Sequence, residues 1–159
     1  MDIQRINTYK SNFDSIQKTE NLHEDVKSII RFARDKAYTT VNIVQVEAYW
    51  KIGERIVEQE QKGKERAEYG SELLKKLSID LTKEFGKGFS VGSLYYYRQF
   101  YTTFPNIFAT VWRILSWSHY KRLLRVDNEE ARNWYLKEAA EQMWSYRTLD
   151  RNIKTETHI

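Results

Sequence analysis

The stretch from Leu77 to Pro105 constrains the fold most, because it joins two helical patterns through a short glycine turn. Before the turn, leucines recur at steps of three and four and form one apolar stripe, at Leu73, Leu74, Leu77 and Leu81. Gly86 stands where a helix favours a left-handed C-terminal residue, and Ser90 stands where an N-cap opens the next helix. These signals predict a helix, a turn and a second helix over residues 71–104.

The second helix of this pair has two different faces. Its apolar face carries Val91, Leu94, Tyr97, Tyr101 and Phe104, and its outer face carries Ser93, Tyr96, Gln99 and Thr102 with Arg98 beside them. Pro105 fits the end of the helix. A polar, aromatic and basic outer face after a glycine turn is typical of a DNA-reading helix-turn-helix. A plain helical hairpin gives the same pattern, so both interpretations stay open.

The distribution of charge says more than the net charge of +4. No Asp or Glu occurs from Phe85 to Val126, and this stretch holds six cations: Lys87, Arg98, Arg113, Lys121, Arg122 and Arg125. Such a basic field suits a phosphate backbone, because each neutralised phosphate releases counterions. An ordinary solvated surface is the alternative interpretation.

Length and composition predict one soluble domain, and the helical patterns along the chain predict that it is all-α. The chain has 159 residues, 41% of them hydrophobic, with one Pro and six Gly. It has no cysteine and no long apolar run, so we expect a cytoplasmic location and no membrane partner. We expect an N-terminal arm over residues 1–20 and a single helical domain over 21–159. That domain would combine a long N-terminal helical region with a helix-turn-helix or winged-helix-like unit at 71–104.

The long helical region carries two apolar stripes: Leu22, Val26, Ile29, Ile30 and Ala33, then Val41, Val44, Ala48, Ile52 and Ile56. Between the two stripes, residues 37–40 are predicted to form either a break between two helices or a weak point within one helix. A helix this long needs a partner, within the chain or in a second copy.

Later signals predict shorter helices. Residues 107–112 fit a helical turn or a strand of a small wing. Helix starts are predicted at Ser71, at Ser116 or Ser118, at Asp127 and at Ser145.

The sequence offers little for catalysis. His119 has no acid near it in sequence, so we expect a structural or phosphate-contacting role. Three scattered His and no Cys give no metal-ligand spacing. The pair Glu60 and Lys62 resembles a nuclease Glu-x-Lys motif but lies at a polar helix end without strand signals. We therefore expect no catalytic residue, no metal site and no cofactor.

A series of motifs resembles the N-terminal domain of YhcG-like bacterial proteins. These motifs are Tyr49–Val57, Ala67–Gly70, Leu77–Ser78, Phe85–Ser90, Arg98–Tyr101, Leu115–Tyr120 and Trp144–Ser145. The resemblance covers about residues 30–154. It implies a helical domain with a DNA-binding role, attached in the family to a C-terminal half that looks like a PD-(D/E)xK nuclease. The sequence ends about where that half would start, so the nuclease acids and lysine have no counterpart in it. Ser93 stands where the family often has Asn.

Our first hypothesis is therefore a non-catalytic DNA-binding module that delivers an attached or partner nuclease to DNA. The residues predicted to contact nucleic acid are Lys87, Arg113, Lys121 and Arg122 at phosphates and Ser93, Tyr96, Arg98 and Gln99 in a groove. The alternative is a protein-interaction module, in which the helical region from Leu22 to Glu58 pairs with a second copy to form a homodimer. A nuclease acting alone ranks last.

Overall fold

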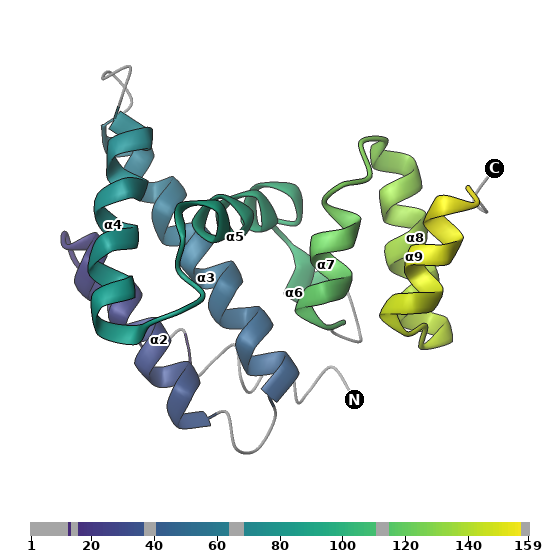
Figure 1. Cartoon of the computed structure of the whole chain (residues 1–159), viewed down its shortest axis with the longest axis horizontal. Coiled ribbons are helices and arrows are strands. Elements are labelled where there is room, and N and C mark those ends of the chain that lie inside the picture. Colours follow the sequence, from purple (N-terminus) through teal and green to yellow (C-terminus); the bar gives the residue numbers. More distant parts are fainter. Residues whose placement is uncertain (1–12, 14–15, 37–40, 64–68, 111–114, 157–159) are drawn as a thin grey trace.

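The computed structural model describes residue 13 and residues 16–36, 41–63, 69–110 and 115–156. Within these ranges every regular element is a helix and no strand occurs, which confirms the predicted all-α class. The helices form an elongated molecule, with α2 (Leu22–Lys36) and α4 (Tyr69–Phe85) at one end and α8 (Glu129–Gln142) and α9 (Tyr146–Lys154) at the other (Figure 1).

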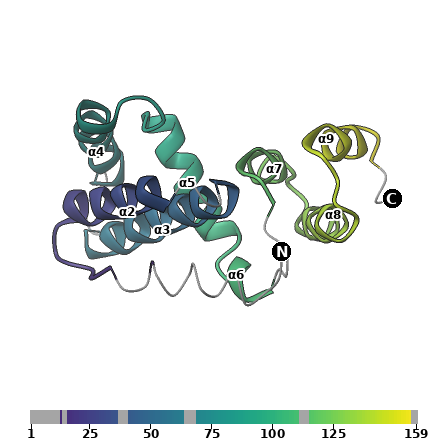
Figure 2. The ribbon, with the colours of Figure 1, turned by 90° about the horizontal axis from the view of Figure 1, so that it is seen from below.

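The long helical region is two helices that pack side by side. α2 and α3 (Val41–Lys62) lie against each other in both views (Figures 1 and 2). Both predicted stripes face this contact, and their central members are buried: Val26, Ile29, Ile30, Val44, Ala48, Ile52 and Ile56. The predicted break at 37–40 lies outside the described residues. Since the stripes cover each other, the chain itself supplies the partner that they need.

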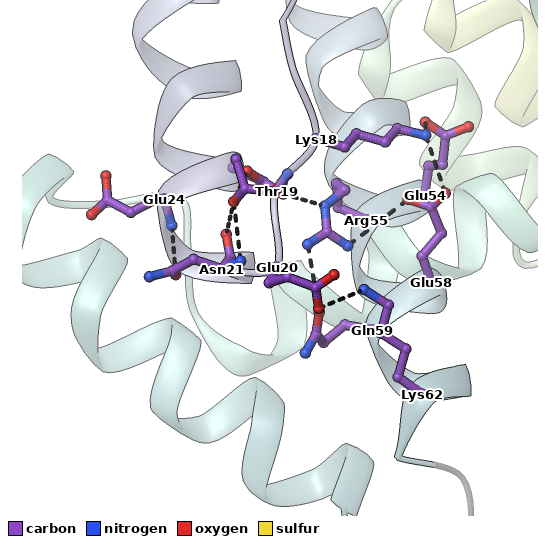
Figure 3. Close-up of polar contacts among 11 residues, drawn as sticks. Lys18, Thr19, Glu20, Asn21, Glu24, Glu54, Arg55, Glu58, Gln59 and Lys62 are labelled. Atoms are coloured by element: carbon purple, nitrogen blue, oxygen red, sulfur yellow. Dashed lines mark hydrogen bonds and ion pairs between the residues drawn. The ribbon is translucent and has the colours of Figure 1, made fainter.

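Charged side chains also join α2 to α3. Arg55 Nε lies 2.8 Å from Asp25 Oδ2, and both side chains are almost fully buried, with 3% and 4% exposed. Thr19 completes the shell of Asp25 with its backbone N–H at 2.8 Å and its hydroxyl at 2.7 Å. Further out, Lys18 bridges Glu54 and Glu58, and Lys62 pairs with Glu20 (Figure 3). The described part of the predicted arm is thus fixed to α3.

The predicted turn between α4 and α5 (Val91–Thr103) has the expected chemistry. Gly86 follows the last residue of α4 with φ +82°, and the Ser90 hydroxyl accepts from the Ser93 backbone N–H at 3.1 Å. The Tyr97 hydroxyl closes the turn by donating to the Gly88 carbonyl at 2.8 Å. Burial raises the pKa of Tyr97, so this hydroxyl stays a donor. One prediction was wrong: Ser71 lies within α4, which already includes Tyr69, and not at its N-cap.

α5 crosses α3 at very close range. A Cβ on Gly53 of α3 would lie 2.0 Å from the Tyr97 carbonyl oxygen and 3.0 Å from Tyr101 Cβ. Only glycine leaves room for this approach of two helix backbones. The inner face of α5 is buried through Leu94, Tyr97 and Phe100.

After Pro105 the chain forms α6 (Ile107–Thr110), a single helical turn. Residues 107–112 were predicted to form a helical turn or a wing strand, and the described residues 107–110 form the helical turn. Residues 111 and 112 lie outside the described residues.

The C-terminal end packs α7 (Trp117–Leu123), α8 and α9 against one another (Figure 1). Ser116 and Ser145 cap α7 and α9 as predicted. The cap predicted at Asp127 was wrong, because Asn128 accepts from the Ala131 backbone N–H at 2.8 Å. The core of this end contains Tyr120, Leu123, Tyr135, Ala139 and Leu149 and extends onto Phe100 and Phe104 of α5. α5 thus joins the two ends of the molecule.

Candidate nucleic-acid interface

The predicted contact residues differ in how much solvent reaches them. Lys87, Gln99 and Lys121 are exposed, Ser93, Tyr96 and Arg98 are half-buried, and Arg122 is buried with 8% of its surface exposed. Arg113 lies outside the described residues. The structure therefore separates these residues into groups with different neighbours.

One group forms where α5 meets α7. The Lys121 ammonium lies 4.7 Å from the centroid of the Tyr96 ring, a cation–π arrangement that holds the charge in place. Nearby, the Gln99 side-chain amide donates to the Leu124 carbonyl at 3.4 Å. Arg125 follows directly and is exposed. Tyr96, Gln99, Lys121 and Arg125 thus make one surface, which we call the α5–α7 surface.

The cations of the α5–α7 surface are not neutralised by neighbouring acids. Among the described residues, neither Lys121 nor Arg125 has a carboxylate oxygen within 4 Å. The acid-free segment from Phe85 to Val126 therefore supplies two cations that face solvent. Anions such as phosphate are attracted to charge of this kind.

Arg98 and Arg122 are engaged by acids from outside the acid-free segment. Arg98 Nε lies 2.6 Å from Glu60 Oε1 on α3, and Arg122 Nε lies 2.7 Å from Asp150 Oδ1 on α9. Hydrogen bonds from Arg122, and then from Lys154, lower the pKa of the Asp150 carboxyl. Two cations of the acid-free segment from Phe85 to Val126 are thus neutralised by acids that lie elsewhere in the sequence. In this conformation Arg122 is a packing residue of α7 and α9 and does not face solvent.

Lys87 and Ser93 lie apart from that surface. Lys87, in the turn before α5, lines a cavity of about 270 Å³ together with Arg34 and the apolar side chains of α2 and α3. Ser93 accepts a hydrogen bond from the Ser90 hydroxyl at 3.1 Å in the N-cap of α5. The structure therefore does not bring all the predicted contact residues to one face.

The outer face of α5 is narrow. Its other sides pack on α3, α4 and α7, and only Gly92, Tyr95, Gln99 and Thr102 are exposed along it. None of these four exposed residues is charged, and Arg98 beside them pairs with Glu60. α5 therefore presents no unpaired cation of its own to a ligand.

His119 has a structural position. It is buried, with Nε2 2.8 Å from the Trp144 carbonyl oxygen and Nδ1 2.6 Å from Ser116 Oγ. A carbonyl only accepts, so Nε2 carries the proton and the Ser116 hydroxyl donates to Nδ1. This histidine joins the start of α7 to the turn before α9.

The acids and histidines of the described part form no metal-binding group of three. Glu60 pairs with Arg98 and Lys62 with Glu20, so the Glu-x-Lys pair is held in separate ion pairs. None of the described helices combines the length and apolar character needed to cross a membrane.

Two groups of exposed cations were not among the residues predicted to contact nucleic acid. Arg125 lies four residues after Lys121 and belongs to the acid-free segment, but it was not one of those predicted residues. On α9, Arg147, Arg151 and Lys154 are spaced by four and three residues, which places them on one helix face. The spacing alone could have identified this basic stripe.

The described part of the chain is all-helical, and it exposes Lys121 and Arg125 without a carboxylate partner. Residues 25–159 match the family described as DUF1016 N-terminal domain, and the chain belongs to this family. This confirms the predicted resemblance. The chain is 33% identical over 168 aligned positions to the protein named "Putative nuclease YhcG" of Escherichia coli (strain K12). The match covers 86% of this chain and 45% of that relative, so the chain spans less than half of the relative's length. No solved structure matches the chain.

Proposed function

We propose that this chain is a non-catalytic DNA-binding module that brings a nuclease, attached or separate, to DNA. The observation that carries the proposal is the α5–α7 surface, where Lys121 and Arg125 face solvent and Lys121 is positioned over Tyr96. The relationship to a protein named as a nuclease supports a nucleic acid as the ligand. A module with this role works in the cytoplasm, where bacterial DNA lies.

Within this proposal the predicted residues take different roles. Lys121 and Arg125 contact phosphates, and Tyr96 and Gln99 lie at the edge of the contact. Arg98 and Arg122 position helices through Glu60 and Asp150. Lys87 and Ser93 remain predictions of the sequence, since they lie away from the α5–α7 surface.

Binding to random-sequence duplex DNA tests the proposal, measured by fluorescence anisotropy at about 50 and 200 mM salt. We expect wild type to bind and to weaken steeply with salt. A Lys121→Ala/Arg125→Ala variant should bind more weakly, with a salt slope smaller by about two. The matched control is Lys76→Ala/Lys83→Ala, which removes two exposed cations from α4. The proposal is wrong if wild type shows no binding at about 50 mM salt.

A protein-interaction or homodimer module is the second candidate. Ile79 on α4 favours it, because this apolar side chain is 70% exposed. The α2 and α3 stripes do not support it, since they are buried against each other. Sedimentation at increasing concentration distinguishes the two: an Ile79-dependent dimer without DNA affinity favours the second candidate.

A further inference from the structure

The turn between α8 and α9 is short and closed by its own hydrogen bonds. Three residues join the helices: Met143, Trp144 and Ser145. Met143 is left-handed at φ 57°, and the N–H groups of Met143 and Trp144 both bond back to the Ala139 carbonyl. Ser145 then caps α9 by accepting from the Thr148 backbone N–H at 3.1 Å. A connection of three residues has the length found between the two helices of a helix-turn-helix.

α9 presents a basic face to solvent. Arg147, Arg151 and Lys154 are exposed and lie on one side of the helix, while Leu149 on the opposite side is fully buried. Lys154 pairs with Asp150 at 3.0 Å. Among the described residues, the side chains of Arg147 and Arg151 have no hydrogen-bonded or ionic partner. Two guanidinium groups are therefore free to bind an external anion.

The base of α9 is fixed. The Arg122–Asp150 pair joins it to α7, and His119 holds the Trp144 carbonyl of the turn at 2.8 Å. A recognition helix needs such support, because its side chains must meet base edges and phosphates in a set register. The exposed residues of α5 include no cation, whereas those of α9 include three.

The charges on α8 also favour α9 as the contact. Glu129, Glu130 and Glu141 are exposed on α8 against one exposed cation, Lys137, so the exposed residues of α8 on balance repel phosphates. A duplex therefore fits α9 better than α8.

We infer that α9 is the recognition helix of this protein and lies in the major groove of duplex DNA, with Arg147 and Arg151 facing the nucleic acid. The exposed Tyr146 is at the N-terminal end of α9, the end that contacts base edges in such motifs. This inference rests on the proposed function and names a different helix from the one that the sequence predicted.

The test compares wild type with Arg147→Ala/Arg151→Ala on random-sequence duplex DNA between about 50 and 200 mM salt. We expect the variant to lose at least about tenfold in affinity at the lower salt, with a shallower salt slope. Arg147→Lys/Arg151→Lys keeps both charges and should retain most of this affinity. Lys76→Ala/Lys83→Ala is the matched control and should bind like wild type. Thermal unfolding followed by circular dichroism checks that all variants fold, as expected for exposed positions.

Two outcomes overturn the inference, and they differ. If wild type binds and Arg147→Ala/Arg151→Ala binds equally well at both salts, α9 is not the recognition helix, while the proposed DNA-binding function stands. If wild type itself does not bind at about 50 mM salt, the proposed function fails and the inference fails with it.

Discussion

Most cations of α2 and α3 pair with carboxylates, whereas three exposed cations of α7 and α9 do not. Arg55 of α3 is buried on Asp25, and Lys27 of α2 bridges Asp80 and Glu84. Lys18, which precedes α2, bridges Glu54 and Glu58 of α3. On α7 and α9, Lys121, Arg147 and Arg151 are exposed without a described carboxylate partner. Similar residue types thus stabilise the fold at one end and are available to a ligand at the other.

The largest effect is expected where a cation is buried. Arg55→Met leaves the Asp25 carboxylate in the interior without its charged partner, and we expect a loss of about 3 kcal/mol in the free energy of unfolding. Urea denaturation measures this loss. The control is Arg31→Met, which breaks an exposed pair with Glu84 and should cost less than about 1 kcal/mol. Equal losses in the two variants would contradict the account of the buried pair.

The crossing of α3 and α5 is the next most sensitive point. Gly53→Ala places a methyl group against the Tyr97 backbone, and we expect a loss of about 2 kcal/mol, as for other overpacked sites. Gly92→Ala is the matched control, because its Cβ would meet only Ser90 Oγ at 3.8 Å. Alanine favours the helix there, so Gly92→Ala should be neutral or stabilising by up to about 1 kcal/mol. Urea denaturation of both variants decides this.

Arg122 belongs to the C-terminal end, but it is buried and paired with a carboxylate like Arg55 of α3. Arg122→Met breaks the contact of α7 with α9, so we expect a stability loss between those of Arg55→Met and Arg31→Met. DNA affinity should also fall, although Arg122 is buried, because α9 loses its support. If stability falls while DNA affinity is unchanged, α9 does not depend on this pair for binding.

The exposed arginines of α9 should have the smallest effect on stability. Arg147→Ala and Arg151→Ala remove no described contact, so each should change the free energy of unfolding by less than about 0.5 kcal/mol. A larger loss in urea denaturation would mean that these side chains support the fold.

Acid should weaken both halves through carboxylates with lowered pKa values. Hydrogen bonds from Lys27, and then from His23, lower the pKa of Asp80 below its ordinary value of 3.8, and Arg122 does the same for Asp150. Their contribution is complete above the unfolded-state pKa of about 3.9 and is lost as pH falls through the folded-state value. Stability should thus drop below about pH 4. In Asp80→Asn and Asp150→Asn the drop should be smaller, measured by urea denaturation at several pH values.

Local signals predicted much of the fold. The leucine stripe, the left-handed Gly86 and the N-caps Ser90, Ser116 and Ser145 all have short-range causes that a sequence displays. The cap at Asp127 was misplaced by one residue, because Asn128 is an equally good N-cap. The packing of α2 on α3 was one of two options, since an apolar stripe does not identify what covers it.

The candidate site could be predicted less well, because partners far apart in sequence decide which cations are free. Arg98 meets Glu60 and Arg122 meets Asp150 only in the folded chain. A scan for segments without acids cannot detect such pairs. The glycine turn before α5 led to the prediction of a helix-turn-helix there. The turn before α9 instead has Met143 in the left-handed conformation, and no glycine marks it in the sequence.

The most direct test of the account is a titration of the ¹⁵N-labelled chain with a short duplex DNA, followed by NMR chemical shifts. We propose that the unpaired cations of the C-terminal end contact DNA. We therefore expect shift changes on α7, on the turn at Met143 to Ser145 and on α9, with little change on α2 and α4. Changes confined to α2, α3 and α4 would contradict it, as would no change at all at about 50 mM salt.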